Sequence, residues 1–76
     1  MPKLPQISGR ELVKVLLKDR WYKVSQKGSH IKLKKNLKPV GSATIIIPQH
    51  KVLKKGTLSG ILKYSGLSLE KLRSLL

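Results

Sequence analysis

Residues 21–35 read WYKVSQKGSHIKLKK, and the hairpin that this stretch predicts decides the expected fold. Two β-prone segments, 21–26 and 29–35, flank the pair Lys27-Gly28, in which glycine can supply the positive φ of a two-residue turn. Lysines at alternate positions of the second segment are typical of a strand with one solvated face. The sequence therefore predicts an antiparallel β-hairpin.

The apolar side chains set the expected register of this hairpin. If Gln26 pairs with Ser29, one side of the hairpin is apolar and belongs to the core, because paired residues point to the same face. The pairs expected on the core side are Val24 with Ile31 and Tyr22 with Leu33. The pairs expected on the other side are Ser25 with His30, Lys23 with Lys32, and Trp21 with Lys34.

Two main helices are predicted, one before and one after the strands. Ser8 and Glu11 have the spacing of a capping box, which predicts a helix that begins there and runs to about Asp19. The apolar face of this helix is expected to contain Leu12, Val13, Leu16 and Leu17. Thr57 is expected to cap the second helix, which ends near Gly66.

A third strand and a short C-terminal helix complete the expected order. Residues 43–47 are predicted to form a strand that Pro48 stops, and Ser68 is expected to cap a short helical extension. This order indicates the α+β class, with a three-stranded antiparallel sheet and two main helices on its apolar face. We expect residues 1–76 to form a single domain and the other face of the sheet to be open.

The charge of the chain points to an anionic partner. Seventeen Lys and Arg against three Asp and Glu give the 76 residues a formal net charge of +14. Nucleic acid is the first candidate, and an acidic protein or an anionic membrane surface would also fit. The three acids, Glu11, Asp19 and Glu70, are scattered, and there are no cysteines. We therefore expect neither a bound metal nor another cofactor.

The sequence predicts a cytoplasmic protein without a membrane span. Residues 1–10 lack the apolar core and cleavage site of a secretory signal. The longest uninterrupted apolar run, Ile45-Ile46-Ile47, is far too short to cross a bilayer.

The open face of the sheet is expected to carry His30 together with Lys23, Lys32 and Lys34. Clustered lysines on a strongly basic chain indicate an anion site. Neighbouring ammonium groups disfavour the imidazolium, so we expect a ring that can accept a proton at pH 7. With RNA, this base could take the 2′-OH proton while the lysines hold the adjacent phosphate, which would cleave the strand without metal.

The sequence leaves the roles of several other residues open, and it also fits a second function. Lys27 at the turn is a weaker candidate for a phosphate contact, and His50 is a candidate auxiliary group, as general acid or phosphate ligand. Trp21 and Ile46 are expected to be exposed beside the lysines, as ordinary surface, a protein interface or a base-stacking platform. The same features fit a non-catalytic RNA-binding module, in which His30 has no chemical role.

Four pieces of the sequence together resemble a known family. They are Ser8-Gly9-Arg10-Glu11-Leu12, Gln26-Lys27-Gly28-Ser29-His30, Ile47-Pro48-Gln49-His50-Lys51, and Leu53-Lys54-Lys55-Gly56-Thr57-Leu58 with Ile61-Leu62. In this order and at these spacings the chain resembles the HicA toxins, the small mRNA interferases of HicA–HicB toxin–antitoxin modules. The resemblance covers nearly the whole chain.

This resemblance implies a fold like that of double-stranded-RNA-binding domains, in the order α-β-β-β-α. It also implies a ribosome-independent endoribonuclease of single-stranded mRNA whose catalytic histidine is His30, with the adjacent Ser29 as a candidate auxiliary residue. The implied partner is a HicB-type antitoxin, which covers the active site and forms hetero-oligomers with the toxin.

Overall fold

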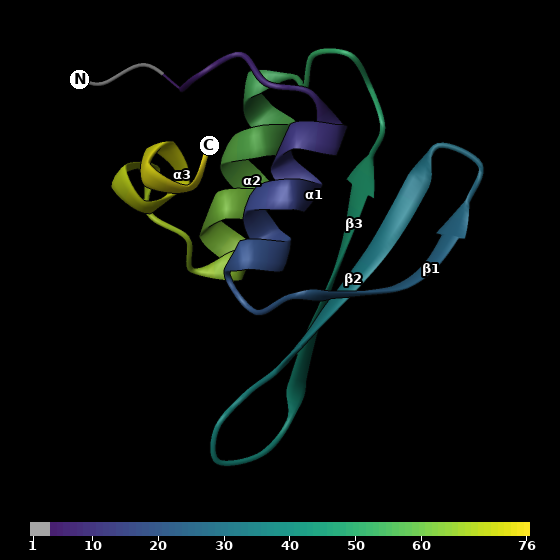
Figure 1. Ribbon diagram of the computed structural model, residues 1–76, viewed down its shortest axis with the longest axis vertical. Coiled ribbons are helices and arrows are strands. Elements are labelled where there is room, and N and C mark those ends of the chain that lie inside the picture. Colours follow the sequence, from purple (N-terminus) through teal and green to yellow (C-terminus); the bar gives the residue numbers. More distant parts are fainter. Residues whose placement is uncertain (1–3) are drawn as a thin grey trace.

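The computed structural model describes residues 4–76, in which a helix, three strands and two further helices follow one another (Figure 1). The elements are α1 Gly9–Lys18, β1 Tyr22–Lys27, β2 His30–Asn36, β3 Ser42–Pro48, α2 Lys55–Ser65 and α3 Leu69–Leu75. The strands form one antiparallel sheet in the order β1-β2-β3, which confirms the α+β class and the predicted order of elements. None of the helices within residues 4–76 combines the length and the apolar composition that crossing a membrane requires.

The core lies between one face of the sheet and the helices. Alternate residues of β2 and β3 are buried on that face, which is the pattern of strands with one solvated side. The buried residues from the sheet are Ile31, Leu33, Ile45 and Ile47, and those from α1 and α2 include Leu12, Val13, Val15, Leu16, Leu58 and Leu62. The intervening residues Lys32 and Ile46 are exposed, so the second face of the sheet is open at its centre.

Helix α1 begins with the predicted capping box. The Glu11 N–H donates to Ser8 Oγ, and the Ser8 N–H donates to Glu11 Oε1, both at 3.0 Å. The buried face differs from the prediction at two positions, because Leu17 is 47% exposed and Val15 is buried. Val15 follows Leu12 by three residues and therefore lies on the same side of the helix, whereas a spacing of five residues turns Leu17 away.

The ends of α2 and α3 follow the sequence signals with one exception. Helix α2 begins earlier than predicted, with Lys54 as its N-cap, so Thr57 lies in the first turn and is not the cap. Gly66 ends α2 in the left-handed conformation with φ 72°, as predicted. Ser68 caps α3, because its Oγ accepts a hydrogen bond from the Lys71 N–H at 3.1 Å.

The predicted register of the β1–β2 hairpin is wrong. The turn is Gly28-Ser29 and not Lys27-Gly28, and Gly28 has φ 55° at the first turn position, where a type II′ turn places glycine. The observed partners are Lys27 with His30, Gln26 with Ile31, Ser25 with Lys32, Lys23 with Leu33, and Tyr22 with Lys34. None of the predicted cross-strand pairs occurs, because moving the turn by one residue changes the partner of every residue in β1.

An irregularity in β1 also moves its apolar residues out of the core. The register shifts between Lys23 and Ser25, so β1 has one extra residue there, as in a β-bulge. Val24 and Tyr22 are 49% and 43% exposed, so the prediction that they face the core is wrong.

Trp21 takes the core position that these residues leave. It is 3% exposed, so its predicted place on the open face is wrong. Arg20 ends α1 with a positive φ of 71°, and the Trp21 N–H then donates to the Leu16 carbonyl at 3.0 Å. This Schellman-type ending directs the following apolar residue back onto the core.

The backbone at Arg20 yields a stability prediction. A left-handed conformation costs an L-residue about 1–2 kcal/mol, and glycine avoids that cost but gains freedom in the unfolded chain. We therefore expect Arg20→Gly to raise the free energy of unfolding by about 0.5–1 kcal/mol, as measured by urea denaturation. Lys14→Gly in the exposed middle of α1 is the control and should lower it by about 1 kcal/mol. A less stable Arg20→Gly variant would contradict the expected strain.

Candidate functional site

Strand β2 presents a basic face to solvent. His30, Lys32 and Lys34 alternate with the buried Ile31 and Leu33, so the pleat of the strand places all three on the open face. His30 and Lys32 are exposed, and Lys34 is half-buried. This arrangement agrees with the face that the sequence predicts for these three residues.

Two rows of side chains cross the open face, because residues paired across strands point to the same side. The first row is Ser25, Lys32 and Ile46, and the second row is Lys27, His30 and Pro48. The β2 members of the rows are two residues apart, which separates the rows by about 6.6 Å. Within a row, neighbouring Cβ atoms are about 5 Å apart.

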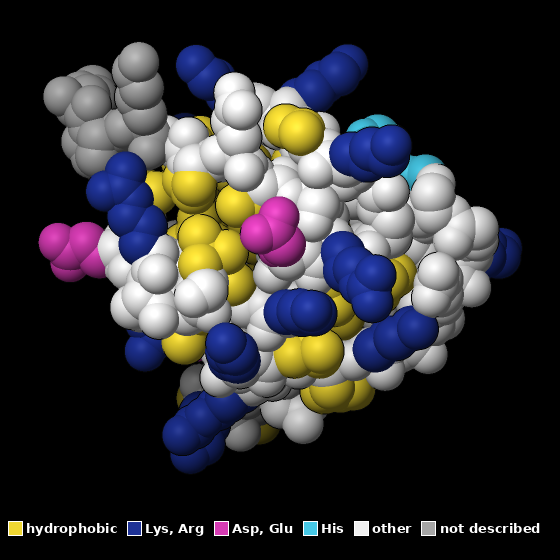
Figure 2. Space-filling view, turned by 45° about the horizontal axis from the view of Figure 1, so that its top comes forward, with side chains coloured by type: hydrophobic (Ala, Val, Ile, Leu, Met, Phe, Trp, Pro, Cys, Tyr) yellow, Lys and Arg dark blue, Asp and Glu magenta, His cyan; other side chains and the backbone are white. Residues whose placement is uncertain are grey.

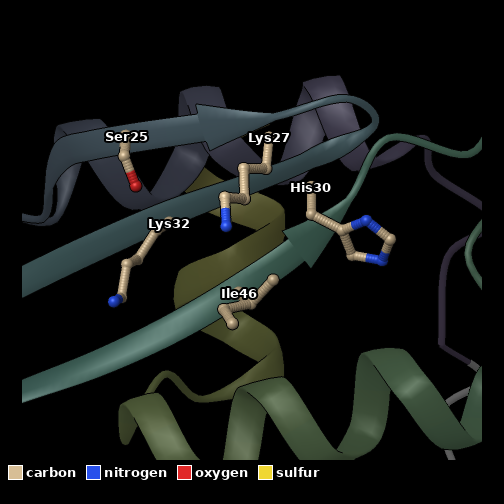
Figure 3. A pocket seen from close by; sticks show the side chains of 5 residues that line it. All are labelled: Ser25, Lys27, His30, Lys32 and Ile46. Atoms are coloured by element: carbon tan, nitrogen blue, oxygen red, sulfur yellow. The ribbon is translucent and has the colours of Figure 1, made fainter.

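A pocket of about 400 Å³ lies over these rows and is lined by Ser25, Lys27, His30, Lys32 and Ile46 (Figure 3). The lining comes from all three strands. In Figure 3, the side chains of Lys27 and Lys32 extend over the sheet, and the imidazole of His30 extends past the end of β3. The volume is that of a small-ligand site. The pocket thus combines two ammonium groups, an imidazole, a hydroxyl and one isoleucine.

Lys23 lies outside this group. Its partner across the hairpin is Leu33, so it points to the core side of β1, where its Nζ donates to Gln26 Oε1 at 2.9 Å. The predicted pairing of Lys23 with Lys32 on the open face is therefore wrong. The displaced turn and the irregularity in β1 are the reason.

Ser29 and His50 do not line the pocket, but their carbonyl groups anchor one end of it. The Ser29 carbonyl accepts a hydrogen bond from the Gln49 N–H at 2.6 Å, and the His50 carbonyl accepts one from the Gly9 N–H at 3.0 Å. These two bonds tie the end of β3 to the hairpin turn beside His30 and to the start of α1.

Glycine at position 9 allows α1 to approach this segment closely. Gly9 is buried, and a Cβ at this position would overlap the carbonyl oxygen of Pro48. The first turn of α1 therefore lies directly against the chain that leaves β3. Because Pro48 is the cross-strand partner of His30, this contact supports the end of the pocket that holds the imidazole.

Acidic side chains lie away from the pocket. Glu11 closes the capping box, Asp19 pairs with Lys35 at 3.3 Å, and Glu70 is in α3. Within residues 4–76, no carboxylate lines the pocket, and no group of three or more His, Cys, Asp or Glu could hold a metal ion. Figure 2 shows Lys and Arg spread over the visible face, with few acidic side chains among them. The local field therefore attracts anions.

Sequence reasoning gives no role to Ser25 and leaves the role of Ile46 open. Ile46 is 54% exposed, which confirms its predicted exposure. The signal for Ile46 is its position between the buried Ile45 and Ile47, since a strand alternates its faces. The sequence predicts Ser25 on the open face, and its pairing with Lys32 confirms that face, but the predicted partner, His30, is wrong because the register of the hairpin differs.

The comparisons with known proteins give one match. Residues 9–67 match a family model described as "HicA toxin of bacterial toxin-antitoxin". The matched range spans more than half of the chain and includes every residue that lines the pocket. A search of the curated proteins and a search of the solved structures found no match.

The packing of Gly9 yields a second prediction. We expect Gly9→Ala to lower the free energy of unfolding by about 1–3 kcal/mol, the usual cost of overpacking, and to shift the amide resonances of residues 48–50. Urea denaturation and NMR measure the two effects. Gly60→Ala is the matched control, because it lies inside α2 with open space around it and should raise the stability by about 1 kcal/mol. A fully stable Gly9→Ala variant would contradict the close contact.

Proposed function

The chain belongs to the HicA toxin family of bacterial toxin–antitoxin systems, and on this premise we propose that it is a metal-independent endoribonuclease of mRNA. In this proposal His30 is the general base. The observation that carries the proposal is the pocket, in which His30 shares an exposed face of the sheet with Lys27 and Lys32. Cleavage of RNA by its own 2′-OH needs a group that accepts the hydroxyl proton and cations that stabilise the phosphate. The imidazole of His30 and the two lysines are groups of these kinds.

The RNA supplies the nucleophile of the proposed reaction. The imidazole of His30 takes the proton of a 2′-OH, whose oxygen attacks the adjacent phosphorus. The bond from phosphorus to the 5′-oxygen breaks, that oxygen takes up a proton from water as it leaves, and the His30 imidazolium returns its proton to the solvent. The products are a 2′,3′-cyclic phosphate and a 5′-OH. Binding the phosphate beside the imidazole of His30 holds the reacting groups in one orientation, which is a major source of rate enhancement.

Lys27 and Lys32 are the proposed contacts to the reacting phosphate. Lys27 is the direct cross-strand partner of His30, and Lys32 lies two residues along β2 in the same pocket. Ammonium groups in these positions stabilise the negative charge that grows on the phosphate oxygens during attack. Lys34 continues the open face and is proposed to contact a neighbouring phosphate. Lys23 is left out, because it points to the other side of β1.

A HicB-type antitoxin is the proposed protein partner. A toxin–antitoxin family implies such a partner in general. We propose that the antitoxin forms a hetero-oligomer with this chain and covers the open face of the sheet, which would exclude RNA from the pocket. The net charge of +14 favours an acidic surface on the partner.

A non-catalytic RNA-binding module is the second candidate. The same lysines would hold an RNA backbone whether or not His30 takes a proton, so strong binding with a steep salt dependence fits both functions. Only strand cleavage separates the two candidates.

Replacing His30 tests the catalytic proposal. We expect His30→Ala to slow single-turnover cleavage of an unstructured RNA at least about 100-fold, because it removes the general base. RNA affinity and the circular dichroism spectrum should stay near those of the parent chain, since the lysines remain. His50→Ala is the matched control and should cleave within a few-fold of the parent, because His50 does not line the pocket.

Two outcomes would count against the proposal. Cleavage by His30→Ala at the parent rate would remove His30 from the mechanism. RNA that stays intact with the folded parent chain, free of antitoxin, would favour the binding module.

The observed register predicts which lysine binds phosphate. We expect Lys32→Gln to reduce the slope of log Kd against log salt concentration by about one, because one phosphate contact is lost. Lys23→Gln is the matched control on the core side of β1 and should change the slope much less. Fluorescence anisotropy with a labelled single-stranded RNA, in the His30→Ala background, measures both slopes. Equal slopes for the two variants would contradict the assignment.

A further inference from the structure

Ile46 does not fit a pocket that binds phosphate alone. Its side chain is 54% exposed, although it stands beside Lys32 in the pocket lining (Figure 3). Phosphate oxygens and water give an isoleucine no apolar surface to pack against. The exposed part of Ile46 is stabilised only when an apolar surface covers it. A ligand that fits the whole pocket therefore has an apolar part as well as an anionic part.

The rows of the sheet fix how far apart these two parts are. Lys32 is the cross-strand partner of Ile46, so their Cβ atoms are about 5 Å apart. His30 belongs to the next row, about 6.6 Å along the strands. Lys32 and Ile46 are therefore close neighbours within the first row, and the imidazole of His30 lies in the adjacent row. A nucleotide offers a phosphate and the flat face of a base within such distances.

We propose that the first row, Ser25, Lys32 and Ile46, binds a nucleotide next to the phosphate that is cleaved. The base packs on Ile46, and Lys32 holds the phosphate of that nucleotide. The second row, with Lys27 and His30, carries out the reaction. This inference rests on the proposed ribonuclease function and adds a base-binding residue to it.

The contact with Ile46 requires an unpaired base. In a duplex both faces of each base are stacked, so an isoleucine in the lining of a pocket contacts a base face only after the base has left the stack. Packing against a base face does not depend on the identity of the base, because every base has such a face. We therefore expect Ile46 to strengthen the binding of unpaired nucleotides generally and to add little sequence preference.

A comparison of RNA with a backbone that lacks bases tests the proposal. The probes are a short labelled single-stranded RNA and an abasic ribose-phosphate oligomer of the same length, and anisotropy gives their Kd in the His30→Ala background. Ile46→Ala should raise the Kd of the RNA about fivefold, because the base then buries less apolar surface, by an area of roughly one methylene group. The Kd of the abasic oligomer should not change. Ile46→Phe should strengthen binding of the RNA only, because an aromatic ring stacks on bases.

The same Kd measurements include a control variant and show which results would contradict the proposal. Val52 is 55% exposed outside the pocket, and Val52→Ala should change neither Kd. If Ile46→Ala weakens both oligomers equally, Ile46 only supports the positions of the lysines, and the proposal is overturned. Unchanged Kd values for both Ile46 variants would overturn it as well. Circular dichroism checks each fold, and Ile46→Phe keeps the test decisive where Ile46→Ala does not fold.

Cleavage by the parent chain separates this inference from the proposed function. A parent that cleaves RNA, with Ile46 variants that show no base-dependent change, disproves the base contact alone. A parent that never cleaves RNA and binds both oligomers equally disproves the base contact and the nuclease together.

Discussion

The alternation of side chains along β2 is the constraint on which both the fold and the candidate site depend. This strand is central, so every cross-strand pair of the sheet includes one of its residues. Ile31 and Leu33 enter the core from one face, and His30 and Lys32 therefore leave on the other. A slip by one residue would bury ammonium groups, which costs several kcal/mol per ion, and would expose the core. The stability of the core thus holds the imidazole and the cations of the pocket in place.

The register also determines how the positive charges are spaced. On the open face Lys32 lies between Ser25 and Ile46, and Lys27 lies opposite His30, so neither pocket lysine has another lysine as its cross-strand partner. Like charges directly opposite each other would destabilise the sheet. This arrangement places Lys27 and Lys32 in one pocket while it avoids the direct Lys–Lys pair that the sequence suggests. The basic face is therefore compatible with a stable small domain.

Much of the fold follows from local signals, but the hairpin register does not. The N-caps of α1 and α3 and the outward face of β2 depend on residues a few positions apart, and the sequence predicts them well, whereas it places the start of α2 too late. The turn can be Lys27-Gly28 or Gly28-Ser29. Assigning the apolar Tyr22 and Val24 to the core favours Lys27-Gly28, which is wrong. Trp21 fills that part of the core, and a bulge in β1 then leaves Tyr22 and Val24 exposed. The sequence also places Ser25 on the open face, but its partner there, Lys32 and not His30, depends on this choice of register.

In the proposed mechanism the RNA supplies the nucleophile, and the pocket supplies the general base and the cations. The most direct measurement maps one cleavage position in an RNA and then replaces the single 2′-OH at that position by hydrogen. If the RNA supplies the nucleophile, cleavage stops at this position and continues at others, and products of the unmodified RNA end in a 2′,3′-cyclic phosphate. Cleavage that continues at the deoxy position, or products with a 3′-OH and a 5′-phosphate, would contradict it.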